Sequence, residues 1–184
     1  MENLIEKTKA RSTVFQGRLL RLDVDTVTLP DGKEGVREYI RHPGGVGIVA
    51  LTDEGEVLLV KQYRYPYGEV VTEIPSGKRD PGEEPLKTGM RELEEETGYR
   101  AATYTPLGTL YPTPGCCDEV VYLYLATGLT AAQAHPDADE FLAVERCPLE
   151  EMVKRVMAGE ITDAKTQIGI LKTKLLLDGQ KEEA

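Results

Sequence analysis

Three glutamates in the stretch from Gly77 to Tyr99 have a spacing that suits metal chemistry. The stretch reads GKRDPGEEPLKTGMRELEEETGY, and Glu92, Glu95 and Glu96 stand at i, i+3 and i+4. On a helix these intervals bring all three side chains to one side. Clustered carboxylate oxygens suit a hard divalent cation such as Mg²⁺, which often binds substrate phosphates as well. The stretch therefore predicts a metal-binding helix, with a solvated acidic face as the alternative.

The signals for this helix lie at both of its ends. Pro85 suits the first helical position, because its fixed φ fits a helix and its missing N–H would be unpaired there. Gly98 is typical of the residue that follows the last helical turn. Leu86, Met90 and Leu93 predict an apolar stripe offset from the glutamates.

Nine residues of this stretch fit the pattern G-x5-E-x7-R-E-U-x-E-E-x-G-U, where U is apolar or aromatic. They are Gly77, Glu83, Arg91, Glu92, Leu93, Glu95, Glu96, Gly98 and Tyr99. This pattern is the Nudix box, so the stretch resembles the catalytic motif of Nudix hydrolases. The resemblance implies an α/β/α sandwich and metal-dependent hydrolysis of a nucleoside diphosphate linked to another moiety.

Short motifs outside the box resemble the ADP-ribose pyrophosphatase branch of this family, over about residues 12 to 175. They are Phe15-Gln16-Gly17-Arg18, Leu29-Pro30-Asp31-Gly32, Arg37-Glu38, His42-Pro43-Gly44, Gln62-Tyr63-Arg64, Glu73-Ile74-Pro75 and Tyr111-Pro112-Thr113-Pro114-Gly115. The resemblance implies hydrolysis of ADP-ribose to AMP and ribose 5-phosphate. The alternatives are another nucleoside diphosphate sugar or dinucleotide as substrate, or a sensor that binds ADP-ribose without hydrolysis.

For the metal, the resemblance implies Glu92 and Glu96 as ligands of Mg²⁺, or of Mn²⁺ or another divalent cation. Glu95 would ligate it or bridge to it through water, and the carbonyl of Ser76 would add an oxygen. Glu83 would orient Arg91 or contact the metal. Its alternative role is that of a first-turn acid that stabilises the helix dipole.

The general base and the substrate contacts are expected elsewhere. Related ADP-ribose hydrolases use a glutamate from a loop outside the box, which points to Glu140 in the acidic stretch 137–140. The alternative for this stretch is a short solvated acidic loop. The implied substrate-binding residues are Arg37, Glu38, Arg64, Phe15, Pro114 and Glu119. Arg37 and Glu38 would lie near the adenine or ribose, and Arg64 at the phosphates. Their alternatives are a strand-surface ion pair for Arg37 and Glu38 and a core position for Phe15.

Two departures from the family pattern stand out. Cys116-Cys117 follows Pro114-Gly115, where an aromatic residue and a serine are expected, and this affects recognition of the terminal ribose. Gly89 lies inside the helix, where alanine is common. It lowers helix propensity by about 1 kcal/mol, which close packing of the helix on a sheet would explain.

Composition narrows the class of protein. The chain has 184 residues and a formal net charge of −10, and it shows no basic stripe of the kind that binds nucleic acid. We find no apolar run long enough for a membrane span and no signal peptide, so a cytoplasmic location is the default expectation. The three cysteines have no metal-ligand spacing and read as free thiols.

The order of expected elements indicates an α+β protein with two parts. Residues 1–42 form an N-terminal antiparallel β module, with strands near 13–29 and 36–40. Residues 43–178 form the catalytic domain, with a mixed sheet and two closing helices, and 179–184 form a charged tail. The family resemblance also implies a homodimer, with the N-terminal module exchanged or packed across the two-fold axis.

Overall fold

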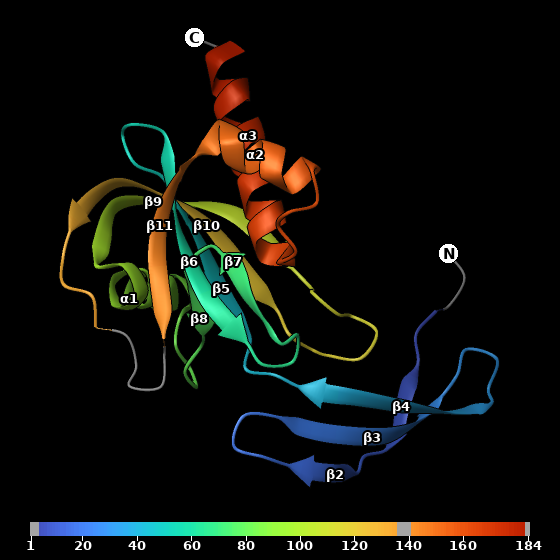
Figure 1. The fold of residues 1–184 in the computed structure, drawn as a ribbon. Coiled ribbons are helices and arrows are strands. Elements are labelled where there is room, and N and C mark those ends of the chain that lie inside the picture. Colours follow the sequence, from blue (N-terminus) through green and yellow to red (C-terminus); the bar gives the residue numbers. More distant parts are fainter. Residues whose placement is uncertain (1–3, 136–140, 183–184) are drawn as a thin grey trace. The chain divides into compact units, whose positions relative to one another are not determined.

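The computed structural model describes residues 4–135 and 141–182. The chain divides into two compact units (Figure 1). The first comprises Met1–Gly44 and Tyr111–Glu119, and the second comprises Gly45–Leu110 and Val120–Ala184. The N-terminal module expected at 1–42 did not include 111–119, which the structure joins to it.

The first unit is an antiparallel sheet centred on one strand. Its strands are β1 (Lys7–Ala10), β2 (Thr13–Gln16), β3 (Arg21–Thr28) and β4 (Glu34–Arg41), and β3 pairs with each of the other three. The 111–119 loop attaches to β4, because the Ile40 N–H donates to the Cys116 carbonyl at 2.9 Å and the Asp118 N–H donates to the Ile40 carbonyl at 3.0 Å.

Polar side chains fill the place of a hydrophobic core in this unit. Among its described residues, Val27 is the one buried hydrophobic side chain, beside the buried carboxylates of Asp23 and Asp25. Asp23 accepts a hydrogen bond from the Thr13 hydroxyl at 2.8 Å, and Asp25 accepts one from the Tyr39 hydroxyl at 3.1 Å. The unit therefore gains little free energy from apolar burial.

The second unit contains two sheets and the three helices. One sheet has the order β8 (Ser76–Lys78), β5 (Gly45–Ala50), β10 (Val121–Ala131), β9 (Tyr99–Leu110); the other has the order β11 (Leu142–Pro148), β6 (Glu56–Arg64), β7 (Glu69–Glu73). The β5–β10 pair is parallel and the other pairs are antiparallel. The helices are α1 (Pro85–Thr97), α2 (Leu149–Met157) and α3 (Ala164–Glu182).

Strand β5 is covered by helices on both faces, which accounts for its continuous apolar sequence. Val46 and Ile48 belong to a core cluster with Leu93 of α1. Val49 and Leu51 point the other way, into a cluster that includes residues of α2 and α3. The α/β/α sandwich and the α+β class expected from the sequence are therefore confirmed.

Helix α1 lies against this sheet through a glycine. A Cβ atom at Gly89 would lie 2.6 Å from Ile48 Cδ1 and 2.9 Å from Val46 Cγ1, so a larger residue would displace these side chains at the present approach. The predicted stripe is partly wrong, because Met90 is 46% exposed while Leu93 is fully buried. The close contact at Gly89 turns the row Gly89–Leu93 toward β5 and leaves Met90 beside it on the surface.

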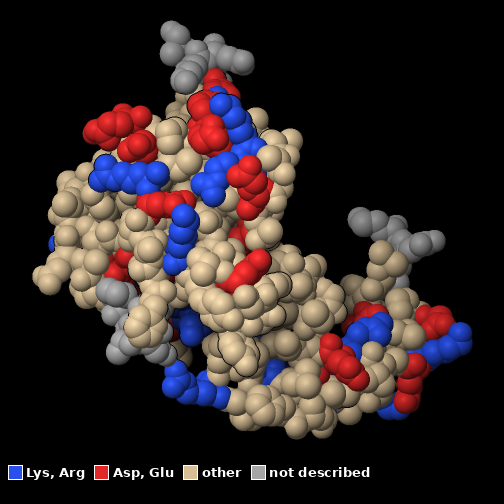
Figure 2. All heavy atoms as spheres, in the orientation of Figure 1, with Lys and Arg blue, Asp and Glu red and all other residues tan. Residues whose placement is uncertain are grey.

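Helix α3 continues to Glu182, past Gly179, where the sequence suggested the start of a charged tail. One glycine in a helix costs only about 1 kcal/mol, which packing along the rest of α3 offsets. Figure 2 shows acidic and basic side chains interspersed over the helices, where Lys174 pairs with Glu150 and Asp178 at 2.7 Å each. No helix in the described part of the chain is long and apolar enough to cross a membrane.

Candidate active site

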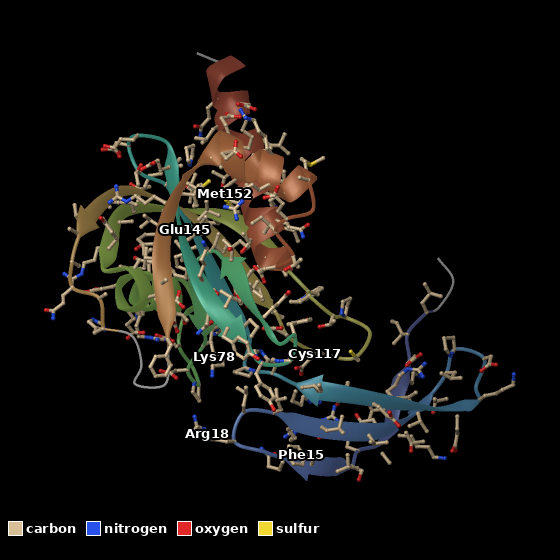
Figure 3. All side chains as sticks on the ribbon, in the orientation of Figure 1. Phe15, Arg18, Lys78, Cys117, Glu145 and Met152 are labelled. Carbon is tan, nitrogen blue, oxygen red and sulfur yellow. The ribbon has the colours of Figure 1, made fainter. Side chains whose placement is uncertain are left out.

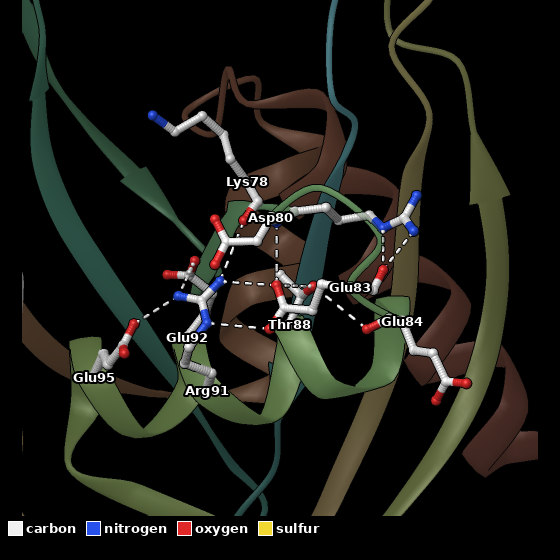
Figure 4. Close-up of polar contacts among 9 residues, drawn as sticks. Lys78, Asp80, Glu83, Glu84, Thr88, Arg91, Glu92 and Glu95 are labelled. Carbon is white, nitrogen blue, oxygen red and sulfur yellow. Dashed lines mark hydrogen bonds and ion pairs between the residues drawn. The ribbon is translucent and has the colours of Figure 1, made fainter. Parts of the chain in front are cut away.

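The loop between β8 and α1 is held in place by Arg79. Its guanidinium donates to the Glu83 carbonyl, from Nε at 3.2 Å and from Nη2 at 2.5 Å (Figure 4). The same guanidinium lies over the Tyr122 ring at 5.4 Å. The Asp80 N–H donates to Glu83 Oε2 at 3.2 Å. The loop therefore presents the Glu83 carboxylate at the start of α1.

Glu83 binds the arginine of the box. Its carboxylate accepts from Arg91 Nε at 3.3 Å and Nη2 at 3.2 Å, and from the Thr88 hydroxyl at 2.7 Å. The hydrogen bond from Arg91, aided by that from Thr88, lowers the pKa of Glu83 to about 2 against the opposing effect of burial. Glu83 is therefore ionised at neutral pH, and its contacts are those expected for a residue that orients Arg91.

Arg91 is the cation shared by the acidic side chains of α1. Its Nη1 donates to Glu92 Oε1 at 2.9 Å and to Glu95 Oε2 at 2.8 Å. Burial lowers the pKa of Arg91, but the hydrogen bond with Glu83 and the charges of Glu92 and Glu95 raise it overall. The ion pair with Glu95 is the one that a solvated acidic face would contain. That alternative does not explain why two other glutamates are buried.

Glu92 and Glu96 are the buried carboxylates of this helix. They are 7% and 3% exposed, and Glu96 Oε2 accepts from the Ser76 N–H at 2.8 Å. A Cβ atom at Gly77 would lie 1.9 Å from the Glu92 carboxylate, so the absent side chain leaves the space that this carboxylate occupies. The box glycine thus lets α1 bring Glu92 against β8.

The donor chemistry of this site fits a hard divalent cation. Glu92 and Glu96 carry carboxylate oxygens that are largely withdrawn from water, and carboxylates in such places are generally paired or bound to a metal. Within residues 4–135 and 141–182, no three Asp, Glu, His or Cys side chains are already gathered as a metal-ligand set. Arg91 instead supplies positive charge to Glu92 and Glu95.

Arg64 also lies in the second unit, and two N–H groups of its guanidinium bind the carboxylate of Glu73. Its Nε donates to Glu73 Oε1 at 2.5 Å and its Nη2 to Glu73 Oε2 at 2.7 Å. This hydrogen bond raises the pKa of Arg64, and the negative charges of Asp163 and Glu96 add to the rise. A guanidinium has five N–H donors, so donors remain beyond the two that contact Glu73. The sequence analysis did not anticipate this use of the fork.

The substrate residues expected on the N-terminal strands lie in the first unit. Arg37 donates from Nε to Glu6 Oε2 at 2.9 Å and forms a second, shorter contact to the same carboxylate. Because neighbours in a strand point to opposite faces, Arg37 and Glu38 of β4 face opposite ways. Phe15 on β2 is 58% exposed (Figure 3), so it is no core residue within this chain.

The 111–119 loop also belongs to the first unit. Pro114 is exposed, Cys116 and Cys117 are free thiols, and Glu119 Oε1 lies 3.3 Å from His42 Nδ1. The sequence analysis missed Asp118, whose carboxylate accepts from Arg41 at 2.9 Å and from the His42 N–H at 2.7 Å. Glu140, the candidate base, lies outside the described residues.

Two family models match adjoining parts of the chain. A family model described as NUDIX domain matches residues 41–166. A second, described as nucleoside diphosphate sugar hydrolase N-terminal domain, matches residues 6–40. The chain belongs to the Nudix hydrolase family.

Individual proteins resemble it over nearly the whole chain. It is 44% identical to an ADP-ribose pyrophosphatase of Bacillus subtilis, over 98% of this chain and 100% of that protein. It is 41% identical to a methanol dehydrogenase activator of Bacillus methanolicus, over 90% of each chain. A solved structure titled "Crystal structure of ADP compounds hydrolase" superposes with a TM-score of 0.84 over 95% of each chain, at 23% identity, which shows the shared fold.

Proposed function

We propose that this Nudix hydrolase cleaves the pyrophosphate bond of ADP-ribose, giving AMP and ribose 5-phosphate, and that it requires Mg²⁺. The observation that carries the proposal is the buried pair Glu92 and Glu96 on a helix with the full Nudix box. The choice of substrate is supported by the 44% identity to the Bacillus subtilis ADP-ribose pyrophosphatase.

The residues that would hold the cation are Glu92 and Glu96, with Glu95, Glu83 and the Ser76 carbonyl as further candidates. When bound, Mg²⁺ would neutralise phosphate oxygens and make water a better nucleophile at neutral pH. Mn²⁺ or another divalent cation would serve the same oxygen ligands.

The side chains of the protein have separate tasks in this proposal. Arg91 holds Glu92 and Glu95 in place, as its contacts at 2.9 and 2.8 Å allow. Arg64 binds the diphosphate through the N–H groups that Glu73 does not use. Glu140 accepts a proton from the attacking water. At the same time the water oxygen bonds to phosphorus, and the bond from that phosphorus to the bridging oxygen breaks. General bases contribute about 10²–10⁴-fold in rate.

The first unit would supply selectivity and the subunit contact. Arg37 and Glu38 are proposed to bind the adenine or ribose, Phe15 to stack on adenine, and Pro114 and Glu119 to approach the substrate. A homodimer in which the N-terminal module is exchanged or packed across the two-fold axis would cover side chains such as Phe15 and Val14, which are 58% and 56% exposed. An active monomer at assay concentration would contradict the idea that dimerisation completes the site.

We propose a cytoplasmic location, which the state of the three cysteines supports. All are free thiols, as expected in a reducing compartment such as the cytoplasm.

The experiment is turnover of ADP-ribose, ADP-glucose, GDP-mannose and NADH in ¹⁸O-labelled water, with identification of the products. We expect the highest kcat/KM for ADP-ribose, with the label in one of AMP or ribose 5-phosphate. A higher kcat/KM for another compound would replace ADP-ribose as the substrate. Tight binding of ADP-ribose with no product from any compound would favour the non-hydrolysing sensor.

A further inference from the structure

Residues Glu73–Ser76 contact both Arg64 and Glu96, one at each end of the segment. Glu73, at the end of β7, binds the Arg64 guanidinium, and Ser76, at the start of β8, donates its N–H to Glu96 at 2.8 Å. Between them, the Pro75 carbonyl accepts from the Ile48 N–H at 2.9 Å. The position of this segment therefore sets the position of both Arg64 and Glu96.

The first turn of α3 holds the same segment at two adjacent residues. Lys165 Nζ contacts Glu73 Oε2 in a short ion pair. The Thr166 hydroxyl accepts from the Ile74 N–H at 2.8 Å, although 92 residues separate the two. One contact reaches a side chain and the other reaches the backbone, so the segment is fixed in both respects.

Asp163 links the two contacts. Its Oδ1 lies 3.0 Å from Lys165 Nζ, and its Oδ2 accepts from the Thr166 N–H at 2.9 Å and from the Thr166 hydroxyl at 2.5 Å. The Thr166 hydroxyl thus accepts from Ile74 and donates to Asp163. We name Asp163, Lys165 and Thr166 the α3 clamp.

Because these contacts are buried, breaking any one of them would destabilise the folded protein. Glu73 is 2% exposed and Thr166 is fully buried. Removing one partner of a buried ion pair leaves an uncompensated charge, and removing the acceptor of a buried N–H leaves that donor unpaired. Burial raises the pKa of Glu73, but the hydrogen bonds and charges of Arg64 and Lys165 lower it overall, so its carboxylate is ionised.

We propose that the α3 clamp positions Arg64 and Glu96 through the Glu73–Ser76 segment, and that Lys165 and Thr166 are positioning residues for catalysis. The catalytic consequence rests on the proposed function, in which Glu96 binds the cation and Arg64 binds the diphosphate. The structural part does not, because the contacts to Glu73 and Ile74 are independent of any ligand.

The structural part is tested by hydrogen exchange at the Ser76 amide, measured by NMR without metal or substrate. In Thr166→Val the segment loses its backbone anchor, and we expect Ser76 to exchange roughly fivefold to tenfold faster, as the loss of about one hydrogen bond predicts. Thr166→Ser keeps the hydroxyl and should retain wild-type exchange. Unchanged exchange at Ser76 in Thr166→Val overturns the clamp, whatever the protein hydrolyses.

The effect of the α3 clamp on Glu96 as a metal ligand is tested by the affinity for Mn²⁺, measured by electron paramagnetic resonance on the free protein. Loss of a group that orients a metal ligand typically weakens binding by about 10–100-fold, which we expect for Thr166→Val and not for Thr166→Ser. If wild type binds no Mn²⁺, the proposed metal site fails, and the exchange experiment alone decides the clamp. If Thr166→Val binds Mn²⁺ as wild type does, the link to Glu96 is overturned.

Lys165 provides a second test, which does not depend on the folding of Thr166→Val. Lys165→Met should raise the KM of whichever substrate the wild type prefers by about tenfold, with a smaller change in kcat, and Lys165→Arg should restore it. Lys174→Met is the matched control, since Lys174 lies on the same helix and its ammonium group pairs with Glu150 and Asp178 instead of Glu73. Equal KM values for Lys165→Met and Lys174→Met would overturn the role of Lys165.

Discussion

The two units of this chain differ in how they hold the charged residues that are proposed to act on the substrate. In the second unit, Glu92 and Glu96 are nearly buried and are held by Arg91, Gly77 and Ser76. In the first unit, the Arg37 side chain is 48% exposed and forms its ion pair with Glu6. The α1 glutamates proposed to bind the metal are thus fixed by the fold, while the residues proposed for selectivity lie on a surface.

This contrast suggests that the second unit determines turnover and that the first unit determines substrate selectivity. A preorganised site needs neighbours that fix its side chains in place, and α1, β8 and the α3 clamp supply them. The first unit has Val27 as the one buried hydrophobic among its described residues, so apolar burial contributes little to fixing its side chains. Substitutions of the α1 glutamates should therefore lower kcat, while substitutions of the selectivity residues of the first unit should raise KM.

The largest effect is expected for Glu96→Gln. A bound metal contributes several kcal/mol to transition-state stabilisation, and each 1.36 kcal/mol is tenfold in rate, so kcat should fall roughly 10²–10³-fold while the fold is kept. Steady-state kinetics and circular dichroism measure both. Glu94→Gln, on the same helix and paired with Arg100, should keep wild-type kcat. An unchanged kcat in Glu96→Gln would disprove the metal-ligand assignment.

Gly77→Ala should have the next largest effect. The new Cβ atom would lie 1.9 Å from the Glu92 carboxylate, which must move, and a displaced ligand typically costs about 10–100-fold in metal affinity or activity. Mn²⁺ binding and kcat measure the loss. Gly179→Ala, whose Cβ atom would meet nothing within 4 Å, is the control. Wild-type Mn²⁺ affinity in Gly77→Ala would show that Glu92 does not need this space.

Arg37→Ala should sharpen the contrast, because it should raise KM and leave kcat nearly unchanged. A hydrogen bond to a charged group contributes about 1.5 kcal/mol or more, which corresponds to roughly tenfold in KM. Lys33→Ala, in the same unit and paired with Asp31, is the control. A fall in kcat with constant KM would place Arg37 among the groups that act on the transition state.

The smallest effect is on stability at low pH. The pKa of Glu83 falls from 4.5 to about 2 on folding, first because of its hydrogen bond from Arg91. The folded state thus favours the ionised form, and this contribution is present above about pH 4.5 and is lost as the pH falls toward 2. Urea unfolding should show that Glu83→Gln loses less stability than wild type over this range. Parallel curves for the two proteins would contradict the shift.

The sequence predicted α1 and its ends well, because both signals are local. Pro85 begins the helix, and Gly98 ends it with a φ of 69°. The box spacing also placed Glu92 and Glu96 on one helical face, where the structure buries both. The α/β/α sandwich followed from the resemblance that this spacing revealed.

Contacts between distant parts of the chain were beyond sequence reasoning. Thr166 and Ile74 are 92 residues apart, and nothing in the local sequence of either predicts their hydrogen bond. Asp118 reaches Arg41 across 77 residues, which joins the 111–119 loop to the first unit. Met90 fitted the helical period but is exposed, because the approach at Gly89 decides which side of α1 faces the sheet.

The buried glutamates of α1 are proposed to support cation-dependent cleavage of ADP-ribose. The most direct test measures AMP and ribose 5-phosphate formed from ADP-ribose by the wild-type protein in saturating Mg²⁺ and in excess chelator. We predict both products in equal amounts with Mg²⁺, and loss of turnover with the chelator that is restored when Mg²⁺ is added back. Equal turnover in the two conditions, or no product with any divalent cation, would contradict the account.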